Sequence, residues 1–201
     1  DEPFSNIDAR LRNELMIEIR QLLKRLGMTA IFVTHNKDEV FTFADKMAVM
    51  ANGYLLQFDQ PNIICQQPNS YQVADFLQLG SWLPCLVGGI KASSLLGEIK
   101  LGSNKGSEQG LRYLLVKPSQ LQLNEDVSAN TIANAQVDYI SLTEQGFHYY
   151  FSSLDGKSDK KLQFSKLSLY SHIVLSIKQK VQLSINPHTF LFFTKDNALQ
   201  L

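Results

Sequence analysis

Three side chains near the start of this 201-residue chain have the chemistry of a hydrolytic site. Asp1 and Glu2 are adjacent carboxylates, and His35 directly follows an apolar run. Hydrolysis of a nucleotide requires a ligand for Mg²⁺, a group that orients or deprotonates the attacking water, and stabilisation of the transferring phosphoryl group. Adjacent Asp and Glu can supply the first two, because consecutive side chains point in different directions where a strand ends. A histidine nearby can hydrogen-bond a γ-phosphate.

A helix is predicted directly after the acidic pair. Asp8 is a suitable N-cap, the helix runs to about Arg25, and Gly27 suits its C-terminal end. The expected buried face is one apolar stripe at helical spacing, made of Leu11, Leu15, Ile19, Leu22 and Leu26. The helix would therefore cover one face of a sheet.

A strand is predicted over residues 28–34, which are nearly continuously apolar. Such a run is typical of a strand buried on both faces of a parallel sheet. Ligands collect at the carboxyl ends of these strands, so we expect His35 to reach the sheet edge that holds Asp1 and Glu2. Taken alone, a histidine after an apolar strand also fits a packed core residue.

A second helix and a hairpin are predicted next. Asn36 can cap the helix, and Glu39 three residues later fits a capping box. The expected buried face of this helix is Val40, Phe41 and Ala44. Residues 46–50 and 54–58 have strand patterns, and Asn52-Gly53 between them favours a tight turn.

The second half of the chain has a different pattern. Residues 80–89 contain Pro84 and two consecutive glycines, which favours a linker. Short strands are predicted beyond it, at residues 95–101, 111–116, 135–142, 147–153, 161–164, 180–185 and 190–193. Short strands separated by turns are typical of a small barrel or a sandwich.

Composition excludes several classes of protein. Lys+Arg and Asp+Glu number 19 each, so no net charge favours nucleic acid or an anionic membrane. Two cysteines, Cys65 and Cys85, lack the spacing of a zinc site or a disulfide framework. No apolar run is long enough to cross a bilayer.

The ordered motifs of the first half carry a family resemblance. Residues 1–8, DEPFSNID, are followed by VTH at residues 33–35 and by DKMAVM at residues 45–50. This series closely resembles the second half of an ABC-transporter ATPase subunit. The Asn52-Gly53 turn also fits, since a hairpin commonly follows the sheet in these proteins.

The resemblance implies a role for each candidate residue. Asp1 and Glu2 match the last two positions of the Walker B motif. Asp1 would then help to hold Mg²⁺, usually through water, and Glu2 would be the catalytic base. Ser5 and Asp8 match the D-loop, which crosses the interface of the ATPase dimer. His35 matches the switch histidine.

A second region extends the resemblance. Residues 116–121, VKPSQL, resemble the Val-Arg-Pro-x-x-Leu signature of the C-terminal domain of importer ATPases. Lys117 replaces the usual arginine, which retains the charge without a bidentate fork. Residues 180–185 and 190–193 resemble the closing strands of that transport-associated OB-like domain.

The expected fold class is therefore an α/β remnant of an ABC ATPase (P-loop NTPase) domain, followed by an all-β OB-like small barrel. The expected boundaries are residues 1–80 for the first domain, 81–92 for a linker and 93–201 for the second. We expect the chain to be the C-terminal portion of such a subunit, from the end of Walker B onward. No Gly-x-x-x-x-Gly-Lys-Ser/Thr phosphate loop occurs in the sequence. The complete parent would be an ATPase, whereas this chain alone is expected to be inactive and not to bind ATP.

The resemblance also implies cofactors and partners. The complete parent would use Mg-ATP, pair with a second copy of itself and drive transmembrane permease subunits served by an external solute-binding protein. Its location would be cytoplasmic, peripheral on the inner face of the plasma membrane, with no nucleic-acid partner. Residues 114–123 favour a ferric-iron importer, ahead of sulfate, polyamine and sugar importers.

Other interpretations remain open at this point. The β-rich half can be a regulatory or dimerisation module that senses a small anion or a partner protein. Tyr149-Tyr150-Phe151 would suit stacking of nucleic-acid bases, but alternation along a strand favours core and surface positions instead. A basic cluster fits a solvated loop face, and its members are Lys157, Lys160, Lys161 and Lys166.

Overall fold

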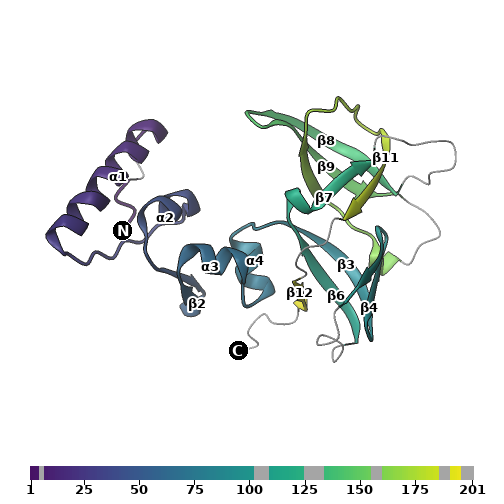
Figure 1. The fold of residues 1–201 in the computed structure, drawn as a ribbon, viewed down its shortest axis with the longest axis horizontal. Coiled ribbons are helices and arrows are strands. Elements are labelled where there is room, and N and C mark those ends of the chain that lie inside the picture. The colour runs from purple at the N-terminus through teal and green to yellow at the C-terminus, as the bar shows by residue number, and fades with distance from the viewer. Residues whose placement is uncertain (5–6, 102–108, 125–133, 155–159, 186–190, 196–201) are drawn as a thin grey trace. The chain divides into compact units, whose positions relative to one another are not determined.

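The computed structural model describes residues 1–4, 7–101, 109–124, 134–154, 160–185 and 191–195. Two compact units divide the chain, residues 1–69 and residues 70–201. The first unit contains three helices and one hairpin, and the second contains one short helix followed by strands (Figure 1). The two halves therefore have the different structural patterns that the sequence predicts.

The first helix, α1 (Ala9–Leu26), begins and ends as predicted. Asp8 accepts a hydrogen bond from the amide of Leu11 at 3.0 Å, and Gly27 adopts a left-handed conformation with φ 63°. The predicted buried stripe is wrong for most of its length. Met16 is the fully buried side chain, while Leu26 is 61% exposed. The face of α1 that contacts α2 is thus rotated away from the leucine stripe.

Residues 28–34 do not form the predicted strand. No secondary structure is assigned to them, and Ile31 is 92% exposed. One backbone hydrogen bond, from Glu2 N to Val33 O at 2.7 Å, joins the segment to the N-terminal residues. A buried parallel strand requires a hydrogen-bonded neighbour along its length. Apart from the bond from Met28 N to Leu23 O at the end of α1, the described residues supply only this one backbone bond to the segment.

The second helix, α2 (Lys37–Phe43), is capped by Asn36, whose side chain accepts from the amide of Asp38 at 3.0 Å. The predicted capping box is wrong in its second half. Glu39 turns inward and the amide of Asn36 donates to Thr34 Oγ1 instead. The predicted burial of Phe41 is also wrong, because this ring is exposed.

An aromatic cluster supplies the apolar contact of α2. The Phe43 ring lies 5.0 Å from that of Phe32 and 6.2 Å from that of Phe4, and both pairs are inclined. Phe4 is buried. These inclined ring contacts join the N-terminal segment, residues 28–34 and α2.

The predicted hairpin is confirmed. Strand β1 (Met47–Ala51) pairs antiparallel with β2 (Tyr54–Asp59). Asn52 and Gly53 both have positive φ, 50° and 80°, as a type I′ turn requires. Helix α3 (Pro61–Gln66) follows and completes the first unit.

An ion-pair cluster ties α1 to the residues before this hairpin. Arg20 and Lys24 contact the carboxylate of Asp45 at 2.5 and 3.2 Å. Hydrogen bonds from Arg20 and then from Lys24 lower the pKa of Asp45 below its usual range. All three groups are solvated, so the cluster orients the elements more than it stabilises them.

The expected linker over residues 81–92 is not a linker. Strand β3 (Ser81–Gly88) and the start of β4 (Lys91–Ser94) occupy it. Leu83, Cys85 and Val87 alternate into the core at the period of a strand. Pro84 is tolerated because β4 pairs only with residues 86–88, so one edge of β3 needs no donor at the proline.

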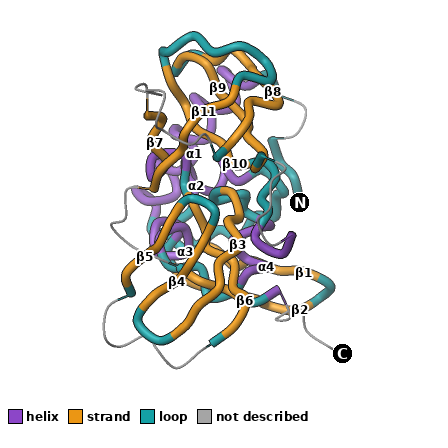
Figure 2. The backbone as a smooth tube through the Cα atoms, turned by 90° about the vertical axis from the view of Figure 1, so that its right-hand side faces the viewer, coloured by secondary structure: helices purple, strands orange, loops and turns teal. Residues whose placement is uncertain are grey.

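The second unit is built from two five-stranded sheets in which all described pairs are antiparallel. Their strand orders are β12-β6-β3-β4-β5 and β10-β9-β8-β11-β7, and Figure 2 shows how strands dominate this part of the chain. The remaining strands are β5 (Gly97–Lys100), β6 (Gly110–Val116), β7 (Leu121–Asn124), β8 (Ala135–Thr143), β9 (Gly146–Ser153), β10 (Leu167–Ser171), β11 (Lys180–Ile185) and β12 (Phe192–Phe193).

The β-rich second half is confirmed, with differences in detail. The strand predicted at residues 161–164 is wrong, since Lys160–Leu162 form the 3₁₀ turn η2. Strands β7 and β10 were not predicted from the sequence. The VKPSQL signature forms the end of β6, the 3₁₀ turn η1 (Pro118–Gln120) and the start of β7.

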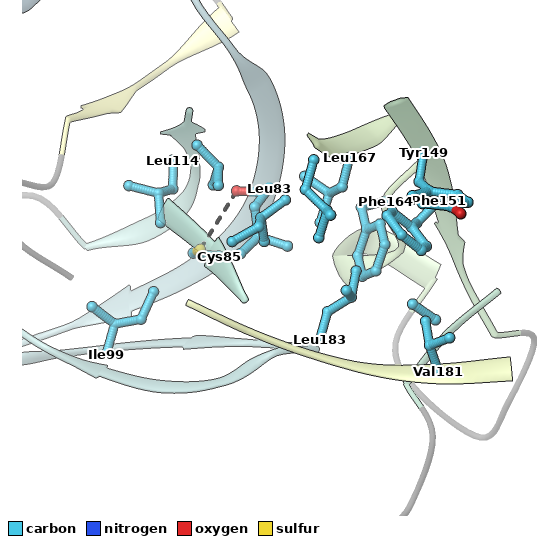
Figure 3. Packing of buried hydrophobic residues seen from close by; sticks show 14 of the residues in the cluster. Leu83, Cys85, Ile99, Leu114, Tyr149, Phe151, Phe164, Leu167, Val181 and Leu183 are labelled. Atoms are coloured by element: carbon cyan, nitrogen blue, oxygen red, sulfur yellow. Dashed lines mark hydrogen bonds between the residues drawn. The ribbon is translucent and has the colours of Figure 1, made fainter. Parts of the chain in front are cut away.

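One hydrophobic core serves both sheets. Leu83 and Leu114 come from the first sheet, and Tyr149, Leu167 and Leu183 come from the second (Figure 3). Burial raises the pKa of the Cys85 thiol to about 12, so this cysteine acts as a packed apolar group. The core excludes Tyr149 and Phe151 from any exposed stacking platform, because both rings are fully buried.

Helix α4 (Tyr71–Phe76) belongs to the second unit, which places the observed boundary at residues 69 and 70. The Tyr71 ring stacks on Trp82 of β3 at 4.1 Å, and the Trp82 indole donates to Asp75 at 2.8 Å. Burial, followed by the charge of Asp75, raises the pKa of Tyr71. These contacts join α4 to the first sheet.

Among the residues that the structure describes, no helix has both the length and the apolar character needed to span a membrane.

We expect the contacts of Trp82 to contribute measurably to the free energy of unfolding of the second unit. Replacing Trp82 by Ala removes the stacked ring and the bond to Asp75, and we expect a loss of about 2–4 kcal/mol. Urea unfolding followed by circular dichroism would measure it. Trp82→Phe keeps a ring and loses the bond, so it should cost about 1 kcal/mol. Equal midpoints for all three proteins would contradict this account.

His148 predicts a pH dependence of stability. Its ring stacks on Tyr170 at 4.1 Å, and burial lowers its pKa. Its Nε2 is buried, and the described residues offer it no hydrogen-bond partner. The fold therefore favours neutral imidazole. The contribution of neutral His148 to the free energy of unfolding is complete above the pKa of the unfolded state, about 6.5. It is lost as the pH falls through the lower pKa of the folded state.

Thermal unfolding between pH 5 and pH 8 would measure this effect. We expect the melting temperature of the wild type to fall at acid pH, and that of His148→Phe to fall less, because Phe keeps the stacking and cannot be protonated. Parallel curves for the two proteins would show that His148 is not responsible.

Candidate functional site

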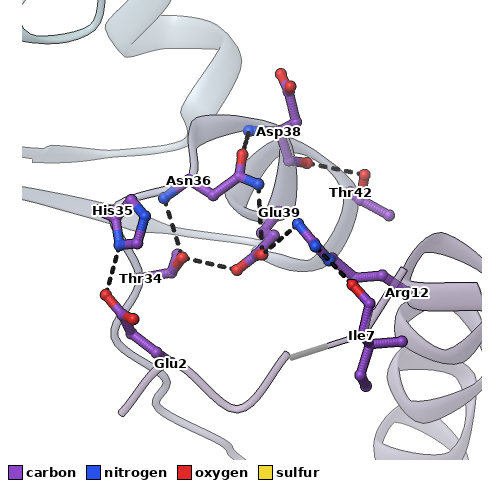
Figure 4. A network of polar contacts seen from close by, with 9 residues as sticks. All are labelled: Glu2, Ile7, Arg12, Thr34, His35, Asn36, Asp38, Glu39 and Thr42. Atoms are coloured by element: carbon purple, nitrogen blue, oxygen red, sulfur yellow. Dashed lines mark hydrogen bonds and ion pairs between the residues drawn. The ribbon is translucent and has the colours of Figure 1, made fainter. Parts of the chain in front are cut away.

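The structure brings together Glu2 and His35, which are 33 residues apart in the sequence. The His35 Nδ1 and Glu2 Oε1 atoms lie 2.5 Å apart (Figure 4). The hydrogen bond from Glu2 N to Val33 O places Glu2 beside the end of the apolar run. Glu2 has a positive φ of 42°, which an L-residue rarely adopts and which turns its side chain toward the imidazole. Carboxylate and imidazole therefore form an adjacent pair capable of proton transfer.

A buried carboxylate supports the turn that carries His35. Glu39 is only 5% exposed, and its Oε2 accepts from Thr34 Oγ1 at 2.7 Å. Thr34 Oγ1 in turn accepts from the amide of Asn36 at 3.0 Å. The residues on either side of His35 are thus fixed to the first turn of α2 (Figure 4).

Arg12 extends this network to α1 and to the segment before it. Its Nη1 contacts Glu39 Oε1 at 3.3 Å, and its Nη2 donates to the carbonyl of Ile7 at 2.7 Å. Arg12 is therefore the cation that balances the buried carboxylate of Glu39. Through it, the segment around Ile7 is held to the same network as the His35 turn (Figure 4).

The remaining predicted site residues have different positions. Asp8 caps α1 through its carboxylate, which is a structural contact. Ser5 lies outside the described residues. Asp1 is exposed and is not joined to Glu2 or His35 by any described contact. The structure brings together two of the five candidates, Glu2 and His35.

The protein side chains of this site do not form a metal site by themselves. The described residues contain no group of three or more His, Cys, Asp or Glu side chains that would hold an ion by itself. Mg²⁺ at nucleotide sites is commonly held by one or two carboxylates together with water and substrate phosphates. The carboxylate of Asp1 is a chemically suitable ligand of this kind, and no described contact joins it to Glu2 or His35.

The Glu2–His35 pair is open to solvent. The exposed fractions of the two side chains are 42% for Glu2 and 79% for His35. Water reaches both groups, and a solvated pair of this kind contributes at most about 1 kcal/mol. Its geometry is thus set by the backbone and by the Thr34–Glu39 contact more than by its own strength.

Sequence reasoning missed Arg12 and the role of Glu39. Glu39 has the spacing of a capping-box residue, so the sequence predicts a helix cap in place of a buried carboxylate. Arg12 occupies a helical position between Asp8 and Leu15 with no motif around it. A charged residue on the core side of a predicted helix was the only signal available.

Comparison with known proteins identifies the relatives of this chain. No protein-family model matches the sequence. The Fe(3+) ions import ATP-binding protein FbpC of Haemophilus influenzae is 35% identical over 142 residues, which cover 70% of this chain and 40% of the relative. The protein of the same name in Brucella melitensis is 30% identical over 186 residues, covering 84% of this chain and 53% of the relative. This chain is a homologue of ABC importer ATP-binding proteins.

The relatives of this chain also include an ATP-binding protein named for polyamine import. The spermidine/putrescine import ATP-binding protein PotA of Nitrosospira multiformis is 34% identical over 141 residues, covering 67% of this chain and 39% of the relative. The chain thus spans between 39% and 53% of the length of these three relatives. The family resemblance read from the motifs is confirmed.

The Arg12–Glu39 pair predicts the stability of the first unit. Arg12→Met keeps the aliphatic stem but leaves the buried carboxylate of Glu39 without its cation, so we expect a loss of about 2–4 kcal/mol. Amide hydrogen exchange in α1 and α2 would report it.

A double variant provides the control for this prediction. Adding Glu39→Gln to Arg12→Met removes the unpaired charge and retains an acceptor for Thr34, so the loss should be smaller than the sum of the two single changes. Strictly additive effects would show that the two side chains do not interact.

Proposed function

We propose that this chain supplies the catalytic base and the switch histidine of an ATP-hydrolysing subunit in an ABC importer. The contact between Glu2 and His35 carries the proposal. It joins two residues separated widely in sequence, and both match catalytic positions of the family. The homology to importer ATP-binding proteins supports the same reading.

The proposed chemistry assigns one task to each group. Glu2 accepts the proton of the attacking water, and His35 orients the Glu2 carboxylate through Nδ1. The opposite ring nitrogen of His35, Nε2, then faces away from Glu2 and is available to a γ-phosphate oxygen. Asp1 would be the residue that helps to hold Mg²⁺, which would supply neutralisation of charge on the phosphates.

The Glu39 network has a positioning role in this scheme. Thr34 and Asn36 flank His35 and are both bonded within the first turn of α2. The same network reaches Ile7 through Arg12. A change at the segment containing Ser5 and Asp8, proposed as the D-loop, is thereby linked to the position of His35.

We further propose the assembly in which this site works. The match of Ser5 and Asp8 to the D-loop supports pairing with a second copy of the subunit, and the pair of subunits would drive transmembrane permease subunits served by a solute-binding protein. The location is peripheral, on the cytoplasmic face of the membrane. Ferric iron is the favoured solute because relatives named as Fe(3+) import proteins match well, and a polyamine is the alternative.

The nucleotide itself requires groups that this sequence does not contain. No phosphate loop occurs in the 201 residues, and such a loop supplies the amides and the lysine that cradle the β- and γ-phosphates. We therefore propose that Mg-ATP binds the complete importer subunit and has negligible affinity for this chain alone. The OB-like topology of the second unit is likewise proposed, supported by its two antiparallel sheets.

Substitution of Glu2 tests the assignment of the base. The chain would be joined to the phosphate-loop half of the Haemophilus influenzae relative, and Mg²⁺-dependent ATP hydrolysis would be measured. Glu2→Gln keeps the size and the contact to His35 but cannot accept a proton, so kcat should fall by roughly 10²–10⁴-fold.

Glu14→Gln is the matched control for this substitution. It makes the same chemical change at an exposed glutamate of α1 that pairs with Arg10 of the same helix. We expect its kcat to equal that of the unaltered chimera. An active chimera whose kcat is unaffected by Glu2→Gln would reject Glu2 as the base.

A further inference from the structure

A polar cleft of about 630 Å³ belongs to the second unit, whereas Glu2 and His35 belong to the first. Its floor is a row across three neighbouring strands: Gln136 of β8 pairs with Ser152 of β9 on one side and with Lys180 of β11 on the other. Figure 1 shows these three strands together in one sheet. Gln136 and Ser152 are partly exposed and Lys180 is exposed, so the row presents polar groups to solvent.

The wall of the cleft is held by the backbone. The segment that begins with η2 contributes Lys160, Gln163 and Ser165. The carbonyl of Phe164 accepts from both the amide and the hydroxyl of Ser153, at 3.0 and 3.3 Å. The Phe164 ring is buried in the core. This anchoring positions the wall independently of any ligand.

Two lysines give the cleft its charge. Lys160 stands on the wall and Lys180 on the floor, and neither forms an ion pair among the described residues. Two ammonium groups to which the described part of the chain gives no carboxylate partner favour an anion between them. Part of the basic cluster predicted as a solvated loop face thus lines a concave surface.

Among the residues with described positions, the acidic side chain of Asp138 contacts two groups of the cleft floor. The Oδ1 atom of Asp138 accepts from Ser152 Oγ at 3.0 Å and from Gln136 Nε2 at 3.5 Å. Asp138 fixes the two polar side chains of the floor and does not line the cleft. The donors that remain for a ligand are the two lysines, the Gln163 amide and the Ser165 hydroxyl.

We propose that this cleft binds a small anion that carries several oxygen atoms. The volume exceeds that of a lone inorganic oxyanion and falls within the range of small-molecule sites, roughly 300–1,000 Å³. Oxygens on at least two sides of the ligand would meet Lys160 and Lys180, and the amide and hydroxyl would add orientation. Phosphate esters and polycarboxylates share this chemistry. The proposal does not depend on the ATPase assignment, because every contributing residue belongs to the second unit.

Calorimetric titration of the full 201-residue chain tests the site. The probes are citrate, glycerol 3-phosphate and inorganic phosphate, each at the same ionic strength set with NaCl. Saturable binding of citrate or of glycerol 3-phosphate is the expected result, and whichever binds more tightly identifies the carboxylate or phosphate class. Binding of none of the three overturns the proposal.

Matched lysine variants locate the binding. Lys160→Gln and Lys180→Gln should each raise the dissociation constant by roughly tenfold, and the double variant should show no measurable binding. Lys100→Gln, on β5 of the other sheet, makes the same charge change away from the cleft and should bind as the wild type does. Circular dichroism would confirm that each variant is folded. An equal weakening in Lys100→Gln, or unchanged binding in the double variant, would place the anion elsewhere.

Discussion

The buried carboxylate of Glu39 is the constraint on which the first unit depends. An ionised carboxylate inside a protein is costly unless cations and hydrogen-bond donors surround it. Arg12 and Thr34 meet that requirement, and each brings a different part of the chain with it. Arg12 fixes α1 and the segment around Ile7, while Thr34 fixes the turn that carries His35. The position of the candidate catalytic pair follows from satisfying one buried charge.

Sequence reasoning succeeds here where the determining physics is local. Asp8 and Gly27 mark the ends of α1, and Asn52-Gly53 forms the hairpin turn, because capping and positive φ depend on a few adjacent residues. It fails where neighbours distant in sequence decide. Residues 28–34 have a strand's composition but lack the ladder that makes a strand. Pro84 suggested a linker, although pairing on one edge alone leaves room for it in β3.

The candidate site shows the same division. The meeting of Glu2 and His35 is expected from a general rule of α/β topology, which brings polar residues to the ends of apolar strands. The two residues do meet, but without the predicted strand, through the backbone hydrogen bond from Glu2 N to Val33 O. The hydrogen-bond network of Glu39, which supports the turn that carries His35, could not be predicted. Glu39 pairs with a residue 27 positions away, and no local pattern distinguishes such a carboxylate from an ordinary helix cap. Buried polar networks are specified by tertiary packing, so their members are visible only in the folded chain.

The openness of the Glu2–His35 pair bears on how it can work. A solvated pair is worth at most about 1 kcal/mol, so His35 gains little by keeping Glu2 as its partner. A charge-assisted hydrogen bond to a phosphate oxygen, shielded from water, is stronger than such a contact. The His35 ring can therefore adjust its orientation at small cost as Nε2 meets a phosphate oxygen, while Thr34 and Glu39 keep its backbone in place. A rigid turn that carries a weakly held side chain is what a phosphate-sensing switch requires. The network around Glu39 supplies the rigidity, and the exposure of His35 supplies the freedom.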